Sequence, residues 1–210
     1  MTGFMYSEER DREVGGDISL DIGVCAYRGA MRSKDPVEKE RLFDHAMRWY
    51  ERSAGMGNTQ AATNLGYIFL YGRVEAPDYD KAFDWFAKGA ELGNEESCYK
   101  LGDMYRSGKG CERDPGKAME LYRKAEVIAH RTCNPEDPQD QAVLASIDLR
   151  LAEQYEHIAG GSAEACRYYR RAVENFESAV DAGLNWYGKI LDSARAGVLR
   201  TEGDGRDFEL

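Results

Sequence analysis

A chain of 210 residues in which 42% of the side chains are hydrophobic holds enough apolar residues to fold, so we do not expect disorder along its whole length. Its formal net charge of −10 argues against binding to nucleic acid or to an anionic membrane, because both need a basic patch. The longest apolar run is far shorter than the ~20 residues of a membrane span, and the charged N-terminus lacks the apolar stretch of a signal peptide. The five cysteines form no CxxC pair, which fits reduced thiols, and we therefore expect a cytoplasmic protein.

The first 58 residues hold an arm and one predicted repeat. Residues 1–16 carry many charges and no periodicity, so we expect a loose or partly helical N-terminal arm. The first repeat, about 17–58, has seven more residues than the next one, and the alignment places them inside its second helix. Since seven residues are nearly two helical turns, the buried face is kept. We predict one continuous helix over about 36–56 that begins after the cap residue Asp35.

The middle of the chain contains the same pattern twice, 36 residues apart. The segment LGYIFLYG (65–72) returns as LGDMYRSG (101–108), and DYDKAFDWFAKGA (78–90) returns as DPGKAMELYRKAE (114–126). A fixed period in this range is typical of solenoids, in which each repeat packs only on its neighbours. We predict repeats over about 59–94 and 95–130, with first helices over about 59–71 and 95–107 and second helices from Asp78 and Asp114.

Two glycines fall in the middle of the first helices of these regular repeats. Gly66 and Gly102 each cost about 1 kcal/mol relative to alanine at such a position. A glycine kept at that cost is typical of a place where a neighbouring helix approaches closely. We therefore predict close helix packing at both residues.

Past residue 130 the period breaks. Residues 130–141 contain Pro135 and Pro138 and form an insertion whose role the pattern leaves open. We predict a fourth, divergent repeat over about 138–183, whose second helix (about 163–182) carries another two-turn extension. A capping helix over 184–200 and an acidic tail over 201–210 complete the expected order.

The pattern LG-x-x-[YF]-x-x-G, then D-x-x-KA-x-x-[WL]-[FY]-x-K-[GA], then LGN resembles the Sel1-like repeat, a relative of the tetratricopeptide repeat. The match is close over 59–129 and extends over roughly 17–183, with Ala152 and Arg171 departing from it in the fourth repeat. The resemblance implies an all-α fold, a right-handed α-solenoid of about four helix–turn–helix repeats plus the C-terminal capping helix. It also implies that the first helices line the concave face, that the protein binds or scaffolds another protein, and that no residue is catalytic.

Few side chains could carry other chemistry. The chain has three histidines, and His130-x-x-Cys133 has the spacing of metal ligands but lacks a second pair, whereas a zinc site needs about four ligands. We predict no enzyme activity and no catalytic, metal-binding or cofactor-binding residue.

The candidate binding residues are located by counting from the leucine of the Leu-Gly pair in the first helix of each repeat. Positions two before, two after and five after the leucine point away from the packed face, and the resemblance turns them toward the groove. Several are tyrosines, which are enriched in interfaces. The alternative is that Leu20 and Leu149, at two of these positions, pack internally and that the tyrosines only cover the helix. The candidate partner-binding residues are Tyr27, Thr63, Tyr67, Leu70, Tyr99, Asp103, Arg106, Glu153 and Glu156.

These features predict an adaptor that binds a protein or peptide partner on its concave face. The acidic Glu153 and Glu156 would suit a basic partner. One alternative is a structural module that forms a homodimer through the C-terminal helix, using Trp186 and Tyr187. Another is the regulatory subunit of an enzyme.

Overall fold

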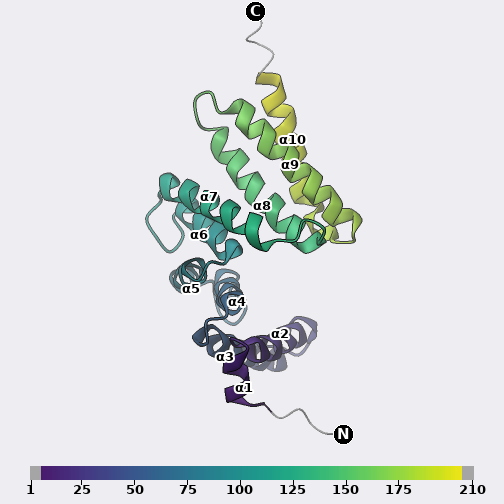
Figure 1. The fold of residues 1–210 in the computed structure, drawn as a ribbon. Helices are drawn as coiled ribbons and strands as arrows, with labels where there is room; N and C mark the ends of the chain where they lie inside the picture. The colour runs from purple at the N-terminus through teal and green to yellow at the C-terminus, as the bar shows by residue number, and fades with distance from the viewer. Residues whose placement is uncertain (1–5, 205–210) are drawn as a thin grey trace, which may run out of the picture. The chain divides into compact units, whose positions relative to one another are not determined.

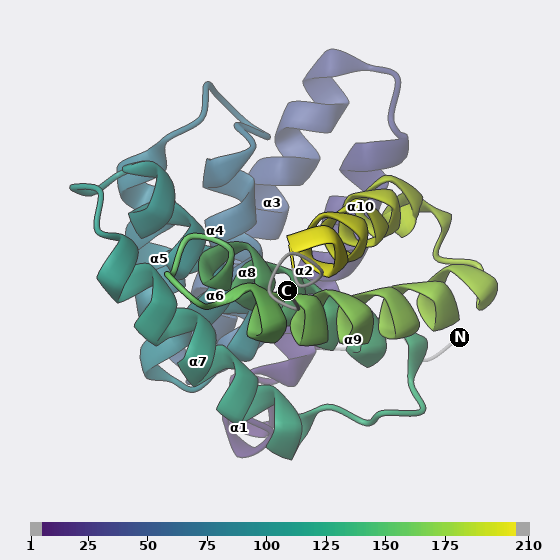
Figure 2. The ribbon, with the colours of Figure 1, turned by 90° about the horizontal axis from the view of Figure 1, so that it is seen from above.

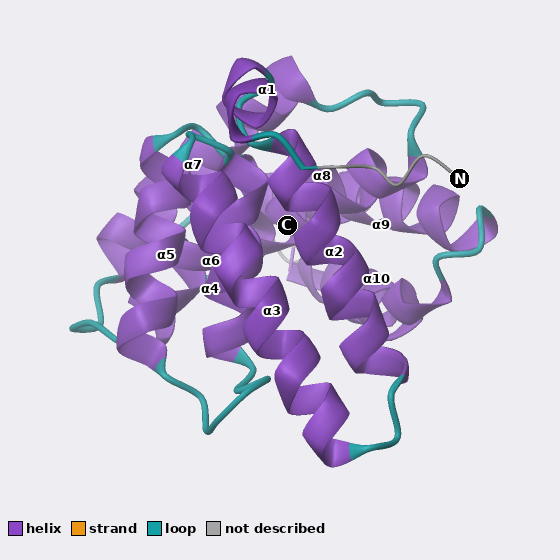
Figure 3. Cartoon of the chain, turned by 90° about the horizontal axis from the view of Figure 1, so that it is seen from below, coloured by secondary structure: helices purple, strands orange, loops and turns teal. Residues whose placement is uncertain are grey.

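The computed structural model describes residues 6–204, and over this range it contains only helices and loops (Figures 1 and 3). The predicted all-α class is thus confirmed. Residues 1–5 of the expected arm and 205–210 of the expected acidic tail lie outside the described residues. The chain divides into two compact units between Asp114 and Pro115, a boundary that falls inside the third predicted repeat.

In the first unit, each helix from α2 to α6 packs on the next one along the chain, as expected for stacked helix pairs. A short additional helix, α1, precedes them. The helices are α1 (Glu8–Glu13), α2 (Asp17–Arg32), α3 (Pro36–Gly55), α4 (Thr59–Leu70), α5 (Tyr79–Glu91) and α6 (Glu95–Ser107).

Side chains just before the helices determine where they begin. Asp35 Oδ1 accepts a hydrogen bond from the amide of Val37 at 3.0 Å, and Asp78 Oδ1 accepts one from the amide of Lys81 at 3.0 Å. Each such bond satisfies a backbone N–H that has no partner within the helix and contributes about 1 kcal/mol. From Asp35 onward α3 runs unbroken to Gly55, which confirms the prediction of one extended helix.

Two mid-helix glycines of the first unit, Gly66 and Gly23, lie against aromatic rings of the following helix. A Cβ added to Gly66 of α4 would lie 2.6 Å from Cε1 of Phe86 on α5. At the matching position of the first repeat, a Cβ on Gly23 would lie 2.6 Å from Cε1 of Tyr50. Both rings are buried. The close approach predicted at Gly66 is therefore confirmed, and tight ring packing offsets the conformational cost of the glycine.

The described part of the N-terminal arm is helical and is anchored to the first repeat. Asp11 of α1 is fully buried, and its carboxylate accepts hydrogen bonds from the Ser19 amide at 3.2 Å, from the Ser19 hydroxyl and from the Tyr6 hydroxyl at 2.9 Å. Arg52 of α3 in turn donates to the Tyr6 hydroxyl at 2.5 Å. Of the two expectations for the arm, loose or partly helical, the described residues therefore agree with the second, and the buried carboxylate holds them because it needs fixed donors.

The second unit contains α7 (Pro115–Thr132), α8 (Pro138–Tyr155), α9 (Ser162–Asp181) and α10 (Gly188–Asp204), with a 3₁₀ turn at Asn185–Tyr187. Consecutive helices pack on one another, and α9 and α10 lie side by side (Figure 2). The capping helix was predicted over 184–200. It begins later, after the 3₁₀ turn, and continues through residues 201–204, which were assigned to the tail.

In the second unit, an aromatic ring packs against a glycine at the contact between α9 and α10. Ala152 of α8 occupies the position that is Gly66 in the regular pattern. The ring of Tyr169 on α9 lies against Gly197 of α10, and a Cβ at Gly197 would overlap it. The capping helix therefore supplies the glycine that the fourth repeat lacks.

Candidate partner-binding site

A pocket of about 350 Å³ lies beside the end of α4 and the second half of α6. Leu70 of α4 and Asp103 of α6, both predicted to face the groove, meet in its lining. Tyr71 and Tyr79 also line it, with 52% and 38% of their surfaces exposed. We call this cavity the first-helix pocket, and its lining residues are Leu70, Tyr71, Tyr79, Lys100, Asp103, Met104, Ser107 and Lys109.

Two lysines add positive charge to the first-helix pocket. The ammonium of Lys100 lies 5.3 Å from the ring centroid of Tyr67, and that of Lys109 lies 5.1 Å from the ring centroid of Tyr79. Cation–π contacts of this kind are worth about 0.5–1 kcal/mol at exposed sites and restrain both amines. An apolar hollow with a few placed charged groups is typical of sites that orient a bound segment.

Tyr67 and Tyr99 hold the two first helices together. Both hydroxyls donate to the same oxygen, Oε1 of Glu96, at 2.6 and 3.1 Å. Burial raises the pKa of the Tyr67 hydroxyl above its ordinary value, and the nearby Tyr99 and Glu96 add to this effect. The Tyr67 ring also packs edge-on against Phe86, with the centroids 5.5 Å apart. These two candidates therefore contribute to the packing between α4 and α6, and a role for them in binding stays a prediction.

Thr63 is not accessible to a partner, so its assignment to the groove is wrong. It is fully buried, and its hydroxyl contacts Asn94 Oδ1 at 3.0 Å and Ser97 Oγ at 2.7 Å. The position faces the next repeat, where this polar cluster joins α4 to the start of α6. Tyr27 is half-buried and packs edge-on against Phe43, with the centroids 5.4 Å apart.

Arg106 is half-buried on α6, and its backbone carbonyl accepts a hydrogen bond from Arg113 Nε at 3.1 Å. It is not part of the lining of the first-helix pocket. Its role in binding stays a prediction.

Glu153 and Glu156 lie at the end of α8 in the second unit, and Glu156 already has partners. Its carboxylate accepts from the Tyr169 hydroxyl at 2.9 Å and pairs with Arg200 of α10 at 3.1 Å. Because Arg200 offsets this negative charge, Glu156 is less suited to a basic partner than the sequence indicated. Trp186, in the 3₁₀ turn before α10, is 66% exposed, and self-association through it stays a prediction.

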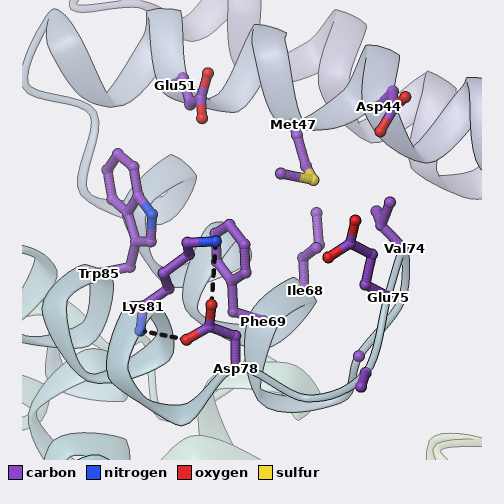
Figure 4. Close-up of a pocket in the computed structure, with 12 residues that line it drawn as sticks. Asp44, Met47, Glu51, Ile68, Phe69, Val74, Glu75, Asp78, Lys81 and Trp85 are labelled. Carbon is purple, nitrogen blue, oxygen red and sulfur yellow. Dashed lines mark hydrogen bonds and ion pairs between the residues drawn. The ribbon is translucent and has the colours of Figure 1, made fainter.

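A second and larger pocket, of about 480 Å³, lies among α3, the end of α4, the following loop and α5 (Figure 4). Met47 and Glu51 reach into it from α3, while Phe69 and Trp85 face them from the opposite side. We call it the second-helix pocket. Its lining residues are Asp44, Met47, Glu51, Ile68, Phe69, Gly72, Val74, Glu75, Ala76, Asp78, Lys81 and Trp85.

The candidate residues predicted from the sequence do not include this pocket, because they were taken from the groove-facing positions of the first helices alone. A signal was present in the alignment of the repeats. Glu51 and Glu75 are acidic, whereas the residues 36 positions later are Ala87 and Cys111. Differences between aligned positions that the packing motif does not explain can indicate a site specific to one repeat.

A buried acid–base pair links α8 and α9 in the second unit. Asp148 is 1% exposed, and its Oδ1 lies 2.9 Å from Arg171. Its Oδ2 has no hydrogen-bond partner among the residues that the structure describes. Burial raises the pKa of the Asp148 carboxyl to about 7, although the positive charge of Arg171 acts in the opposite direction. The carboxyl therefore changes charge near neutral pH.

Within residues 6–204 no group of three or more histidine, cysteine, aspartate or glutamate side chains is placed to hold a metal ion. In the same range, none of the helices combines the length and the apolar character needed to cross a membrane.

The model of the Sel1 repeat family matches residues 20–58, 59–94, 95–126 and 162–184, which together make up more than half of the chain. The first three matches fall within the first three predicted repeats, about 17–58, 59–94 and 95–130. The fourth covers α9 and leaves α8 unmatched, in agreement with the divergence predicted for this repeat.

Three solved structures are similar to this chain. A Sel1 repeat protein from Oxalobacter formigenes is 26% identical with a TM-score of 0.47, and the match covers 57% of this chain and 86% of that one. A protective antigen of uropathogenic Escherichia coli with an SLR fold is 20% identical with a TM-score of 0.41, covering 84% and 48%. Cysteine rich protein B of Helicobacter pylori is 17% identical with a TM-score of 0.41, covering 58% and 91%. Comparison with curated proteins gives no match.

Proposed function

Because this chain belongs to the Sel1 repeat family, we propose that it is an adaptor whose first-helix pocket binds a segment of a partner protein. Sel1 repeats generally act as protein-interaction modules and are typically not catalytic, which favours binding over catalysis. The observation that carries the proposal is the meeting of Leu70 and Asp103, from two neighbouring first helices, at one pocket beside the exposed rings of Tyr71 and Tyr79.

The chemistry of the pocket suits a peptide segment with an apolar or aromatic side chain. Leu70, Met104 and the two tyrosine rings offer apolar surface, and exposed tyrosines are frequent anchors in interfaces. Lys100 and Asp103 supply opposite charges that would set the direction of the bound segment.

The test is affinity capture on the immobilised chain, followed by titration of a captured partner against purified variants. We expect Tyr71→Ala combined with Asp103→Ala to weaken binding about tenfold or more, since truncating an interface hot spot costs roughly 2 kcal/mol. Tyr67 is unsuitable for this purpose because its hydroxyl holds Glu96. Thermal unfolding of the variants should stay close to that of the wild type, since Tyr71 is about half exposed and Asp103 is not buried.

Leu92→Ala is the matched control, because Leu92 is exposed at the end of α5 and lies outside the first-helix pocket. It should bind as the wild type does. If the double variant binds every captured partner as tightly as Leu92→Ala does, the first-helix pocket is not the binding site.

A further inference from the structure

The second-helix pocket combines an apolar floor with an acidic rim. Met47, Phe69 and Trp85 are partly buried and pack on the hydrophobic core of the first two repeats, so their remaining exposed surface forms the floor. Glu51 reaches the rim from α3, and Glu75 reaches it from the loop after α4 (Figure 4). The pocket therefore offers apolar contact and negative charge within one cavity.

One of the four carboxylates that line the pocket is already engaged. Asp78 caps α5 through the Lys81 amide, and its Oδ2 pairs with the Lys81 ammonium at 3.1 Å. Lys81 is the one cationic side chain in the described lining, so Asp78 offsets the only positive charge there.

The other three carboxylates, those of Asp44, Glu51 and Glu75, have no hydrogen-bond or ion-pair partner among residues 6–204. Asp44 also borders a shallow neighbouring hollow that contains Arg41 and Arg48. The carboxylates most available to a ligand are therefore those of Glu51 and Glu75.

The next repeat shows that the packing motif does not require this cavity. The residues 36 positions after Met47 and Phe69 are Phe83 and Tyr105, whose rings pack edge-on with their centroids 5.3 Å apart. The loop there also lies tightly on α5, because a Cβ at Gly110 would overlap the carbonyl of Tyr79. Larger rings and a closer loop fill the space that stays open one repeat earlier.

From this geometry we propose that the second-helix pocket binds an arginine side chain presented by a segment of a partner protein. The aliphatic part of the arginine lies on Met47 and Phe69, and the guanidinium reaches Glu51 on the side of the pocket where Trp85 lies, while Glu75 adds negative charge from the opposite side (Figure 4). Arginine fits better than lysine, because a planar guanidinium both stacks on aromatic faces such as Trp85 and binds carboxylates through two parallel hydrogen bonds. An uncharged apolar side chain would leave the acidic rim without a partner.

The chain itself shows that Trp85 can accept a cation. The ammonium of Lys88 lies over this ring, 4.9 Å from its centroid. The occupant is a protein segment rather than free arginine, because the pocket is bordered by a loop and two helices that can contact the backbone on either side of the arginine. This proposal does not depend on the first-helix pocket, which has different lining residues.

The test is an NMR titration of the full chain with acetyl-Ala-Ala-Arg-Ala-Ala-amide. We expect the indole signal of Trp85 and the methyl signal of Met47 to shift in a saturable way. The peptide with citrulline in place of arginine keeps the shape of the side chain and loses its charge. Its affinity should therefore be lower by at least about tenfold. Free arginine should also bind more weakly than the arginine peptide. Added salt should lower the affinity of the arginine peptide for the chain, because salt screens exposed charge pairs.

Glu51→Gln combined with Glu75→Gln should lower the affinity for the arginine peptide about tenfold, with unfolding unchanged because both side chains are exposed. Asp84→Asn, an exposed position of α5 outside the pocket, is the control for loss of a negative charge and should bind as the wild type does. Equal affinity for the arginine and citrulline peptides, or unchanged affinity in the double variant, would overturn the proposal. Equal affinity for free arginine and the peptide would overturn the assignment to a protein segment.

Discussion

Replacing Gly66 with alanine should destabilise the first unit, although alanine is the better helix former. The substitution gains about 1 kcal/mol of helix propensity. Against this, the new Cβ would lie 2.6 Å from Cε1 and 2.8 Å from Cζ of Phe86, a ring that is fully buried. Overpacking of a closed core costs about 1–3 kcal/mol. The severity of this overlap favours the upper end, so we expect a net loss of about 2 kcal/mol in the free energy of unfolding.

Urea unfolding followed by circular dichroism measures this change, with Gly55→Ala as the matched control. Gly55 lies in α3 of the same unit, and nothing lies within 4 Å of an added Cβ there. Gly55→Ala should therefore stabilise the unit by up to about 1 kcal/mol. Phe86→Leu should partly relieve the clash, so the Gly66→Ala and Phe86→Leu effects should sum to more than the loss in the double variant. If Gly66→Ala stabilises as much as Gly55→Ala, the ring does not explain the glycine.

Two further predictions concern buried carboxylates. The raised pKa of Asp148 means that the folded state holds a proton between pH 4 and pH 7 that the unfolded state has released, so stability falls as the pH rises through this window. The rise of the pKa from 3.8 to about 7 corresponds to a change of about 4 kcal/mol in the free energy of unfolding. Asp148→Asn should remove most of this pH dependence, measured by urea unfolding at pH 5 and pH 8. An unchanged pH dependence would contradict the assignment to Asp148. Asp11→Ala should cost about 1–3 kcal/mol and speed hydrogen exchange in α1 and at the Ser19 amide, because it leaves the buried Ser19 donors unpaired. Unchanged exchange at Ser19 would show that α1 is held by other contacts.

Much of the fold could be predicted because its determinants are local or periodic. The cap at Asp35 and the apolar spacing of α4 depend on residues within a few positions of one another. A seven-residue extension preserves a helical face, which explains why α3 was predicted as one helix. The role of Gly66 was also predictable, because a glycine in the middle of a helix is costly unless something packs closely on it.

The candidate site was harder to predict, because exposure depends on which side chains the neighbouring helix brings. Thr63 and Leu70 occupy comparable positions of one helix face. Asn94 and Ser97 cover Thr63, whereas Leu70 stays open at a pocket. The second-helix pocket exists because the side chain of Met47 fills less space than the ring of Phe83 one repeat later, and because the loop after α4 follows a more open path than the corresponding loop after α6. Periodicity assigns residues to a face, but it does not give the fit between faces.

The contact between Tyr169 and Gly197 determines where this array of helices can end. A chain cut at residue 183, the last residue of the predicted fourth repeat, would lose α10 and leave the buried ring of Tyr169 without the backbone on which it packs. The smallest stable C-terminal boundary therefore lies beyond Gly197. If repeats were gained or lost at this end, α10 would have to be kept together with α9. The smallest segment that can be added or removed there is therefore the three helices α8, α9 and α10, rather than one pair of helices.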